Sequence, residues 1–431
     1  MNLPRYPNYK DSGVEWLGQV PEHWDVCSLK RIVSMKSGES ITAESIDGIG
    51  EYQVFGGNGL RGYTSAFTHD GNYVLVGRQG ALCGNINYAS GKFWASEHAV
   101  VAKPVKRVNH VWLGEMLRTM NLNQYSVAAA QPGLSVDLIE RIGIGLPPVD
   151  EQTQIAAFLD RETAKIDGLV VEQRRLMELL REKRQAVISH AVTRGLSPDA
   201  PMKPSGIEWL GEVPAHWTVP RLAYHATIEN GTTPSRENSD YWLDGNVPWL
   251  SSGEVNQYRI MEANEFITQE ALDKCSLRLL PKGAVVVGMI GQGRTRGLAA
   301  TLEIDACINQ NLAAIIPSKN VLSDYLLYIF QSAYAYLREF GRGGNQAALN
   351  CEILSAMKLP LPPVEEQLHI CKHLGIRLKE FDTLTAEAQR AINLLQERRT
   401  VLISAAVTGQ IDVRGQLKVA VRIDVPVEVA A

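Results

Sequence analysis

The feature that most constrains this chain is a twelve-residue segment that occurs twice. GVEWLGQVPEHW at residues 13–24 returns as GIEWLGEVPAHW at residues 206–217, with nine of the twelve positions identical. A second pair of segments, LPPVDEQ at 146–152 and LPPVEEQ at 361–367, is separated by 215 residues rather than 193. Repeats of this kind indicate a duplicated structural unit. The chain is therefore two copies of one unit, and the second copy is longer by 22 residues.

The two copies resemble each other at their ends and differ in their middles. VLVG at 74–77 aligns best with VVVG at 285–288, at a separation of 211 residues, which places most of the insertion between Gly38 and Val74. Short β-rich runs alternate here with Gly- and Asn-rich turns, a pattern typical of a mixed α/β domain with protruding loops. Two similar frames therefore hold two different inserts.

A long segment without proline follows each LPPV motif, from about residue 151 to 192 and from 366 to 407. Apolar residues recur in each at three-, four- and seven-residue steps, which predicts a long amphipathic helix. They are Leu159, Ile166, Leu169, Leu176, Leu180 and Val187 in the first copy, and Leu374, Phe381, Leu384, Ala391, Leu395 and Leu402 in the second. Each apolar stripe needs a long partner, and the other helix is the simplest one. Gly195 and Gly409 are predicted to end the helices.

The sequence thus predicts an α+β chain with two mixed α/β domains, joined by two long helices that pack as an antiparallel coiled coil with internal pseudo-two-fold symmetry. The predicted segments are an N-terminal repeat segment (1–25), a first α/β domain (26–150), a first long helix (151–195), a repeat segment and linker (196–217), a second α/β domain (218–364), a second long helix (365–412) and a C-terminal tail (413–431).

Composition and motifs argue against several classes of function. The net charge of −4 gives no general case for a nucleic-acid protein, so any polyanion site must be local. Six cysteines without a CxxC pair suit a reducing cytoplasm, and no apolar run is long enough for a membrane helix. No Walker loop, HExxH or Asn-Pro-Pro-aromatic motif is present. His23 and His216 recur beside tryptophans and are interpreted as structural. A self-sufficient enzyme is the weakest hypothesis.

The duplicated SG-[IV]-EWLG-x-VP-x-HW motif and the two LPPV-[DE]-EQ segments, each followed by a helix that closes with AVT, resemble the specificity subunit of Type I restriction–modification systems. The resemblance covers essentially the whole chain. It implies that each insert is a target-recognition domain for one half of a split, asymmetric site in double-stranded DNA, and that the helices set the distance between the halves. It also implies docking of two methyltransferase subunits and two restriction subunits. The chain would then be a non-catalytic, cytoplasmic subunit without a cofactor, and S-adenosylmethionine, ATP and magnesium would belong to its partners.

Candidate DNA-contacting residues are those with donors suited to base edges or phosphates in Gly-rich loops. In the first copy they are Asn58, Arg61, Tyr63, Arg78 and Gln79. In the second copy they are Thr233, Ser235, Arg236, Gln292, Arg294, Arg296, Asn345 and Gln346, with GQGRTRG at 291–297 as the strongest single patch. The chain alone is expected to bind DNA weakly and to bind tightly with a methyltransferase partner.

Other polar groups have structural interpretations. Gln131 and Gln346 occupy matched positions and are interpreted as part of the frame. Asn309 and Gln310 lie in an apolar run, where amides are usually satisfied within the core. The basic segment 181–184 is interpreted as a helix face that is solvated or meets a partner subunit. The alternative function is a tandem coiled-coil adaptor that joins two proteins and never binds nucleic acid.

Overall fold

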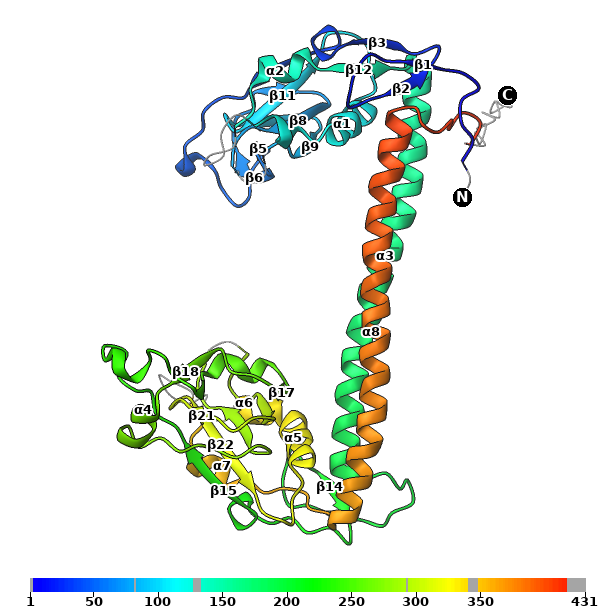
Figure 1. Cartoon of the computed structure of the whole chain (residues 1–431). Coiled ribbons are helices and arrows are strands. Elements are labelled where there is room, and N and C mark those ends of the chain that lie inside the picture. Colours follow the sequence, from blue (N-terminus) through cyan, green and yellow to red (C-terminus); the bar gives the residue numbers. More distant parts are fainter. Residues whose placement is uncertain (1–2, 81–82, 127–132, 292–293, 340–347, 417–431) are drawn as a thin grey trace. The chain divides into compact units, whose positions relative to one another are not determined.

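The computed structural model describes residues 3–80, 83–126, 133–291, 294–339 and 348–416, and the chain divides into two compact units (Figure 1). Unit 1 comprises Met1–Gln173 and Arg390–Ala431, and unit 2 comprises Arg174–Gln389. Each unit contains one α/β domain together with a part of both long helices. No helix in the described part of the chain is long and apolar enough to cross a membrane.

Unit 1 contains two four-stranded sheets, with strand orders β4-β11-β8-β9 and β6-β5-β10-β7, and two strand pairs, β1-β2 and β3-β12. The strands are β1 (Tyr9–Asp11), β2 (Gln19–Pro21), β3 (Asp25–Ser28), β4 (Val33–Ser37), β5 (Tyr52–Gly56), β6 (Gly59–Thr64), β7 (His69–Asp70), β8 (Tyr73–Gly77), β9 (Ile86–Ala89), β10 (Lys92–Ala95), β11 (Ala99–Pro104) and β12 (Gly143–Leu146). The helices are α1 (His110–Thr119), α2 (Val136–Arg141) and the 3-10 turns η1 (Leu29–Arg31), η2 (Ala43–Ser45) and η3 (Leu122–Tyr125).

The core of unit 1 lies between the first sheet and α1. Asn109 caps α1 because its side-chain oxygen accepts hydrogen bonds from the backbone N–H groups of Val111 and Trp112. Trp112 and Met116 of this helix are fully buried in the same cluster as apolar residues of β4, β8 and β11. The consecutive apolar residues of β8 are buried on both faces, because the second sheet covers the side away from α1.

Unit 2 contains a five-stranded sheet of order β15-β22-β19-β20-β17, a three-stranded sheet of order β18-β16-β21 and the pair β13-β14. The strands are β13 (Met202–Pro204), β14 (Glu212–Pro214), β15 (Ala226–Asn230), β16 (Val247–Leu250), β17 (Arg259–Ile260), β18 (Glu265–Ile267), β19 (Val285–Gly288), β20 (Ala299–Leu302), β21 (Cys307–Ile308) and β22 (Leu312–Pro317). The helices are η4 (Leu222–Tyr224), η5 (Ser239–Tyr241), η6 (Ser252–Asn256), α4 (Gln269–Lys274), α5 (Ser323–Ser332), α6 (Tyr334–Glu339) and α7 (Cys351–Ala356).

Backbone pairing shows that the two domains share one plan. In unit 1, the antiparallel pairing of β4 with β11 places Val33 opposite Pro104. In unit 2, the pairing of β15 with β22 places Ala226 opposite Pro317 in the same register. Strands β5 and β10 are parallel, as are β16 and β21. The predicted alignment of VLVG with VVVG is confirmed, because these segments form β8 and β19 at equivalent places in the two sheets.

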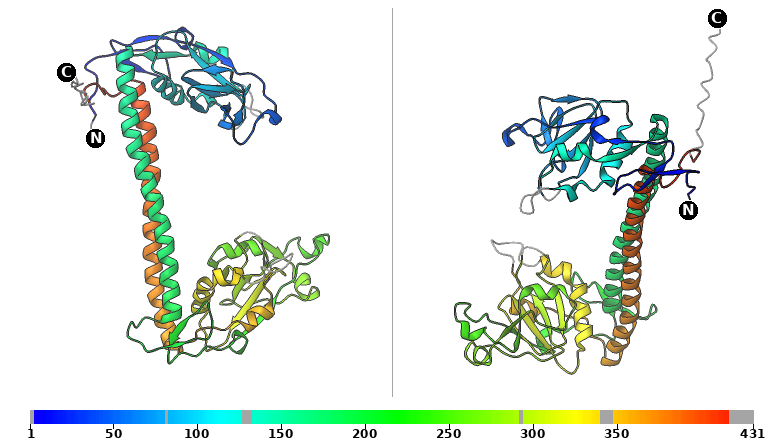
Figure 2. Two further views of the ribbon diagram at one scale, coloured as in Figure 1. Left: turned by 180° about the vertical axis from the view of Figure 1, so that it is seen from behind. Right: turned by 45° about the horizontal axis from the view of Figure 1, so that its top comes forward.

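The two long helices are α3 (Val149–Arg194) and α8 (Val364–Val407), of 46 and 44 residues. They lie side by side in every view (Figures 1 and 2). Their antiparallel pairing is visible inside each unit. In unit 1, Asp167 of α3 pairs with Arg399 of α8 at 3.0 Å, and in unit 2, Arg184 pairs with Asp382 at 2.6 Å. The predicted antiparallel packing is confirmed within both units.

The apolar stripe is narrower than its spacing predicted. Leu159, Ile166 and Leu180 are buried as expected. However, Leu169 and Leu176 are 51% and 43% exposed, and Leu384 in α8 is 46% exposed. The prediction that these three residues lie in the contact between the helices was wrong. They lie on the outer faces of the helix pair. The contact between α3 and α8 uses about two residues per heptad, whereas three- and four-residue steps in the sequence also reach positions beside that contact.

The predicted glycines lie at the ends of both helices: Gly195 directly follows α3, and Gly409 comes two residues after the end of α8. Gly195 and Gly409 have φ angles of +76°, a left-handed conformation that glycine adopts without steric cost. A Cβ added to Gly409 would lie 2.4 Å from Cδ of Pro21 and 3.0 Å from the Trp24 ring. A Cβ on Gly195 would lie 3.3 Å from the ring of Trp217. Each glycine therefore allows a helix end to pack against the repeated dozen, which is the twelve-residue segment at 13–24 in unit 1 and at 206–217 in unit 2.

The repeated dozen also holds the beginning of a helix. Glu151, in the first turn of α3, is buried and accepts hydrogen bonds from the Tyr6 hydroxyl at 2.5 Å and the Trp24 indole N–H at 3.0 Å. Its second oxygen lies 2.8 Å from Nε2 of His23. Burial, reinforced by the hydrogen bond to Glu151, raises the pKa of Tyr6 far above its usual range, so its hydroxyl remains a donor. His23 is structural, as predicted.

Unit 2 carries a weaker version of the same contact. Glu366 lies 2.8 Å from Nε2 of His216, but its side chain is 29% exposed, against 6% for Glu151. The indole N–H of Trp217 has no hydrogen-bond partner among the described residues.

We predict that Glu151→Ala lowers the free energy of unfolding of unit 1 by about 3 kcal/mol, because it leaves buried donors of Tyr6 and Trp24 without an acceptor. Glu366→Ala is the matched control and should cost about 1 kcal/mol or less, since it removes one contact at a solvated carboxylate. Thermal unfolding of the two variants measures the difference. Equal losses of stability would contradict the interpretation of Glu151 as the centre of a buried network.

Candidate nucleic-acid interface

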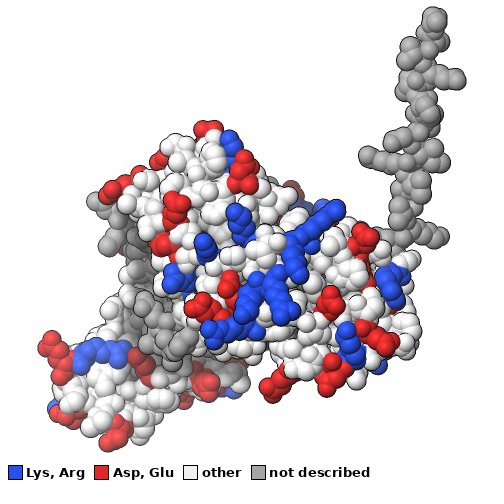
Figure 3. Space-filling model, turned by 90° about the horizontal axis from the view of Figure 1, so that it is seen from above, with Lys and Arg blue, Asp and Glu red and all other residues white. Residues whose placement is uncertain are grey.

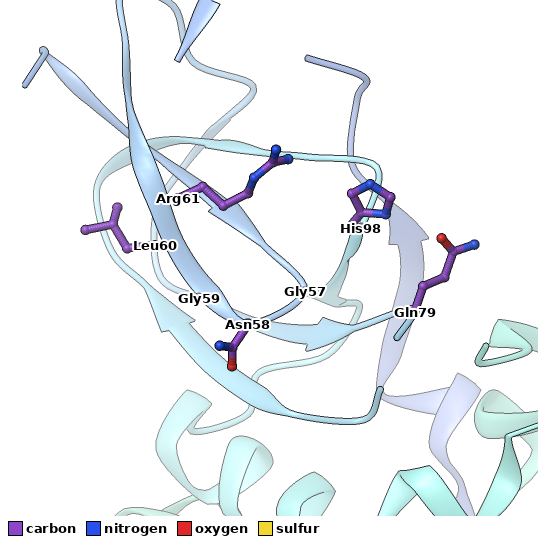
Figure 4. A pocket seen from close by; sticks show the side chains of 7 residues that line it. All are labelled: Gly57, Asn58, Gly59, Leu60, Arg61, Gln79 and His98. Carbon is purple, nitrogen blue, oxygen red and sulfur yellow. The ribbon is translucent and has the colours of Figure 1, made fainter. Parts of the chain in front are cut away.

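Three segments of unit 1 meet around a shallow hollow. They are the tip of the β5–β6 hairpin, the residue pair after β8, and the residue before β11. The hollow is lined by Gly57, Asn58, Gly59, Leu60, Arg61, Gln79 and His98 (Figure 4). The structure thus brings together three of the predicted residues, Asn58, Arg61 and Gln79. It adds His98, which sequence analysis missed because nothing in its local sequence marks it.

Main-chain contacts hold these segments in place. The N–H of Arg78 donates to the carbonyl of His98 at 2.9 Å, and the N–H of Ser96 donates to the carbonyl of Phe55 at 2.9 Å. A Cβ on Gly57 would lie 3.2 Å from the His98 carbonyl oxygen, so glycine permits the close approach of the hairpin tip. The polar side chains therefore project from a rigid base.

The side chains around the hollow have the chemistry of base readers. Arg61 is exposed, and its aliphatic part crosses Gly56, where a Cβ would lie 2.4 Å from Cδ of Arg61. Arg61 and His98 extend along the same side of the hollow, while Asn58 points away from them (Figure 4). Asn58 accepts a hydrogen bond from the Asn85 amide at 3.2 Å. Arginine and amide side chains are the groups that contact guanine and adenine edges in a bidentate manner.

Two other predicted residues of unit 1 lie outside the hollow. Arg78 is half-buried and donates from Nη1 to the Ser37 hydroxyl at 2.9 Å, which ties the loop after β8 to the end of β4. Tyr63 lies within β6, where its backbone exchanges two hydrogen bonds of 2.8 Å with Asp47. Their roles as DNA contacts stay predictions.

In unit 2, the predicted residues Thr233, Ser235 and Arg236 lie in one loop after β15. Two buried or half-buried tryptophans fix this loop. The Trp242 indole donates to the Ser235 carbonyl at 3.0 Å, and the Trp249 indole donates to the Thr232 carbonyl at 3.1 Å. The loop is therefore well placed to present its exposed side chains in one fixed geometry.

Arg236 is held over an aromatic face. Its guanidinium carbon lies 3.7 Å from the centre of the Trp242 ring, and its Nη2 donates to Glu265 at 2.6 Å. Both partners are exposed, at 53% and 42% of their side chains, so the pair is screened by solvent. An arginine in this position keeps donors available for an acceptor outside the protein.

The two arginines of the second basic loop of unit 2, at residues 291–297, differ in their exposure to solvent. Arg294 is exposed and lines a hollow with Arg181, Arg184 and Tyr258. Arg296 is only 8% exposed and donates to the carbonyl of Arg338 at 2.7 Å. The structure places the Arg296 side chain against α6 and not on the surface, and its role as a DNA contact stays a prediction. Gln292, Asn345, Gln131 and Gln346 lie outside the described residues.

The shared plan of the domains locates further candidates in unit 2. Asn309 donates its N–H to the carbonyl of Leu250 at 3.0 Å, as Ser96 does to Phe55 in unit 1. The turn after Leu250 therefore matches the hairpin tip at Gly57. Gln310 accepts the Thr233 hydroxyl at 2.5 Å, so it lies beside this turn and the Thr233 loop. Asn309 is 6% exposed, in agreement with its core interpretation.

The described residues contain no group of three or more His, Cys, Asp or Glu side chains placed to hold a metal ion. The arrangement is instead one of polar, hydrogen-bonding side chains on loops at equivalent edges of two duplicated domains.

Comparison with known proteins agrees with this arrangement. Residues 21–170 and 214–394 match the model of the Type I restriction modification DNA specificity domain, once for each copy of the repeat. The chain belongs to this family.

Individual relatives support the assignment over different extents. The EcoprrI specificity subunit of a Type I restriction enzyme from Escherichia coli is 44% identical over 138 residues, which is 31% of this chain and 34% of that protein. The MjaVIII specificity subunit from Methanocaldococcus jannaschii is 24% identical over 92% of this chain and 95% of that protein. Three of the curated relatives are matched over 34%, 43% and 52% of their own length.

Solved structures show the same fold. One, from a study of complex assembly and conformational transition of the type I R-M system, has a TM-score of 0.69 at 17% identity and covers 92% of this chain and 99% of its own. The HsdS subunit from Thermoanaerobacter tengcongensis has a TM-score of 0.51 at 16% identity and covers 91% of this chain and 98% of its own. The predicted family and fold class are confirmed.

We predict that Gly38→Ala and Gly231→Ala each destabilise their own unit by about 1–3 kcal/mol, the range for overpacking a rigid site. An added Cβ would lie 2.1 Å from the Ala95 carbonyl oxygen at Gly38 and 1.7 Å from the Ile308 carbonyl oxygen at Gly231. Gly48→Ala is the control, because nothing lies within 4 Å of its Cβ position. Thermal unfolding tests this, and a control as destabilised as the two variants would refute it.

Proposed function

We propose that this chain is the sequence-reading, non-catalytic subunit of a Type I restriction–modification complex. Each α/β domain reads one half of a bipartite target in double-stranded DNA, and the helices α3 and α8 set the spacing between the halves. Methylation of adenine, with its S-adenosylmethionine, and cleavage, with its ATP and magnesium, belong to partner subunits. Membership of the specificity-domain family supports this proposal.

The observation that carries the proposal is that two domains of one plan present different side chains at equivalent loops. Unit 1 offers Arg61, Gln79 and His98 around its hollow, whereas unit 2 offers Arg236 and Gln310 near the corresponding turn. Sequence is read by hydrogen bonds to base edges, so a different set of donors and acceptors specifies different bases. One frame with two sets of readers suits an asymmetric target.

The outer faces of the long helices offer equivalent surfaces for two copies of one partner. Leu169 and Leu384 are 51% and 46% exposed, and Leu179 and Leu394 are 53% and 65% exposed. Each pair is separated by the repeat distance of 215 residues. Exposed leucines that recur at the repeat distance give the two copies matched apolar surfaces, and duplicated contacts suit two identical subunits. We assign these surfaces to the methyltransferase subunits.

The adaptor hypothesis uses the same outer leucines but gives the loops no role. It does not account for Arg236, an exposed arginine that is held over a tryptophan face. Under that hypothesis, Arg294→Ala and Arg236→Ala together should leave every activity of the assembled complex intact.

We predict that Leu169→Asp combined with Leu384→Asp leaves the fold intact, because both side chains are exposed, but weakens co-purification with the methyltransferase subunits by at least about tenfold, which corresponds to about 1.4 kcal/mol. Leu169→Met combined with Leu384→Met keeps an apolar surface and serves as the control. Circular dichroism checks the fold, and sedimentation measures the assembly. Unchanged assembly of the aspartate variant would remove these faces from the interface.

Sequence-specific methylation is the direct test of the function. The chain is assembled with its methyltransferase subunits and S-adenosylmethionine, and a library of random duplexes is methylated. Sequencing of the methylated products is expected to yield one bipartite motif with a fixed gap. Methylation of all sequences alike, or equal methylation without the chain, would overturn the proposal.

A further inference from the structure

Unit 1 carries a face rich in positive charge that lies apart from its hollow. Seven exposed cations make up this basic face: Lys30, Arg31, Lys36, Lys103, Lys106, Arg107 and Arg141. Within the part of the chain that the structure describes, none of them has an ion pair or a side-chain hydrogen bond. Figure 3, which views unit 1 from the side of β3 and β12, shows Lys and Arg side chains gathered in a continuous run on this surface.

Backbone pairing explains why these residues are neighbours. The N–H of Val105 donates to the carbonyl of Ile32 at 2.9 Å, which places Arg31 beside Lys106. The positive charges of both residues partly offset the effect of burial on the pKa of the Cys27 thiol, which burial raises. The thiol is therefore within electrostatic reach of both cations.

Backbone pairing also places other cations of the basic face near Arg31 and Lys106. The N–H of Leu29 donates to the carbonyl of Ile142 at 3.0 Å, so the chain at Lys30 lies against the end of α2 at Arg141. In the antiparallel pair of β4 and β11, Ser34 is opposite Lys103 and Lys36 is opposite Val101. Lys36 and Lys103 therefore project from the same side of the sheet edge.

Carboxylates also border the basic face (Figure 3), and two of them are placed by contacts near the cations. Asp25 is exposed near Cys27, and Glu140 accepts the backbone N–H of Met35 at 2.7 Å. Neither forms an ion pair with the seven cations. The face therefore keeps a strong excess of positive charge in a chain whose net charge is −4.

One side-chain hydrogen bond links the strand β4, which carries Lys36, to the loop that carries Gln79 of the hollow. Lys36 is followed by Ser37, whose hydroxyl accepts the Nη1 hydrogen bond of Arg78. Arg78 precedes Gln79, which lines the hollow.

Unit 2 does not repeat this face. Two backbone hydrogen bonds of unit 2 define the matched positions: the N–H of Ser318 donates to the carbonyl of His225 at 2.8 Å, and the N–H of Leu222 donates to the carbonyl of Met357 at 2.8 Å. The residues that replace the seven cations are Ala223, Tyr224, Glu229, Ile316, Lys319, Asn320 and Ala356. One cation and one carboxylate stand where unit 1 has seven cations.

We propose that the basic face binds the phosphate backbone of the DNA that flanks the half-site read by unit 1, so that the complex holds one flank of its target more tightly than the other. This inference rests on the proposed function. Duplex DNA suits the face because it is a continuous polyanion, with one negative charge per about 1.7 Å of helix axis. The link between β4 and the loop of the base-reading hollow, through the hydrogen bond from Arg78 to Ser37, favours DNA over an acidic protein surface.

The test uses the whole complex with its methyltransferase subunits and the target obtained from sequence-specific methylation. Two duplexes carry the target and are each extended by about 15 base pairs, or about one and a half turns, on one side only. A third duplex has no extension on either side. The dissociation constants are measured by fluorescence anisotropy over a range of salt concentrations.

The wild-type complex is expected to bind one extended duplex about tenfold more tightly than the unextended one, and to gain much less from the other extension. Arg31→Gln, Lys106→Gln and Arg107→Gln in one variant should abolish most of that gain. The slope of log K against log salt on the favoured duplex should fall by about 2–3, at about 0.9 per lost phosphate contact. Affinity for the unextended duplex should stay unchanged, which also shows that the variant is folded.

The control removes three cations from the corresponding region of unit 2, by Arg221→Gln, Lys319→Gln and Lys358→Gln, all of which are exposed. It should keep the flank-dependent gain. Equal gains from the two extensions, or equal losses in both triple variants, would overturn the inference. So would a unit 1 variant that fails to assemble with the methyltransferase subunits, since the face would then bind protein. A wild-type complex without sequence-specific methylation would instead refute the proposed function itself.

Discussion

The antiparallel contact between α3 and α8 is the constraint on which the rest of the structure depends. Because the helices run in opposite directions, α3 begins in unit 1 and ends in unit 2, and α8 does the reverse. Each unit therefore needs segments that are far apart in the chain. In unit 1 the N–H of Asp412 donates to the carbonyl of Pro4 at 2.8 Å, so residues near the two ends of the sequence lie together.

This constraint explains the repeated dozen. In each unit, the dozen lies between the first turn of one long helix and the last residue of the other. Trp24 contacts Glu151 at the start of α3 and lies beside Gly409 at the end of α8, and Trp217 lies beside Gly195 in the same manner. A segment that packs against two helix ends at once accepts few changes of residue type. Loops at the domain edges do not have this packing constraint. The frame is therefore repeated closely and the inserts differ.

The frame could be predicted from the sequence because its signals are local and occur twice. Proline positions, heptad-like spacing and the terminal glycines together fixed the helix bounds to within a few residues. The spacing could not distinguish Leu159, which is buried, from Leu169, which is exposed, because both fit three- and four-residue steps and only the partner helix decides between them.

The site was less predictable because strand pairing assembles it. Arg61 and Gln79 stood out as polar residues in Gly-rich loops. His98 and Gln310 enter the site only because β10 and β21 pair in parallel with β5 and β16, which no local pattern reveals. Arg296 has the local sequence of a surface cation, but α6 covers it. Burial of a single arginine depends on tertiary contacts, and sequence composition does not report them.

The central claim is that each unit reads its own half of one DNA target. The most direct measurement is a genome-wide map of methylated adenines in cells that contain the complex with wild-type chain, with Arg61→Ala plus Gln79→Ala, or with Arg236→Ala. The account predicts that the first variant relaxes or abolishes recognition in one half of the motif and the second variant in the other half, with the gap between halves unchanged. Relaxation of the same half by both variants, or an unaltered motif in both, would contradict it.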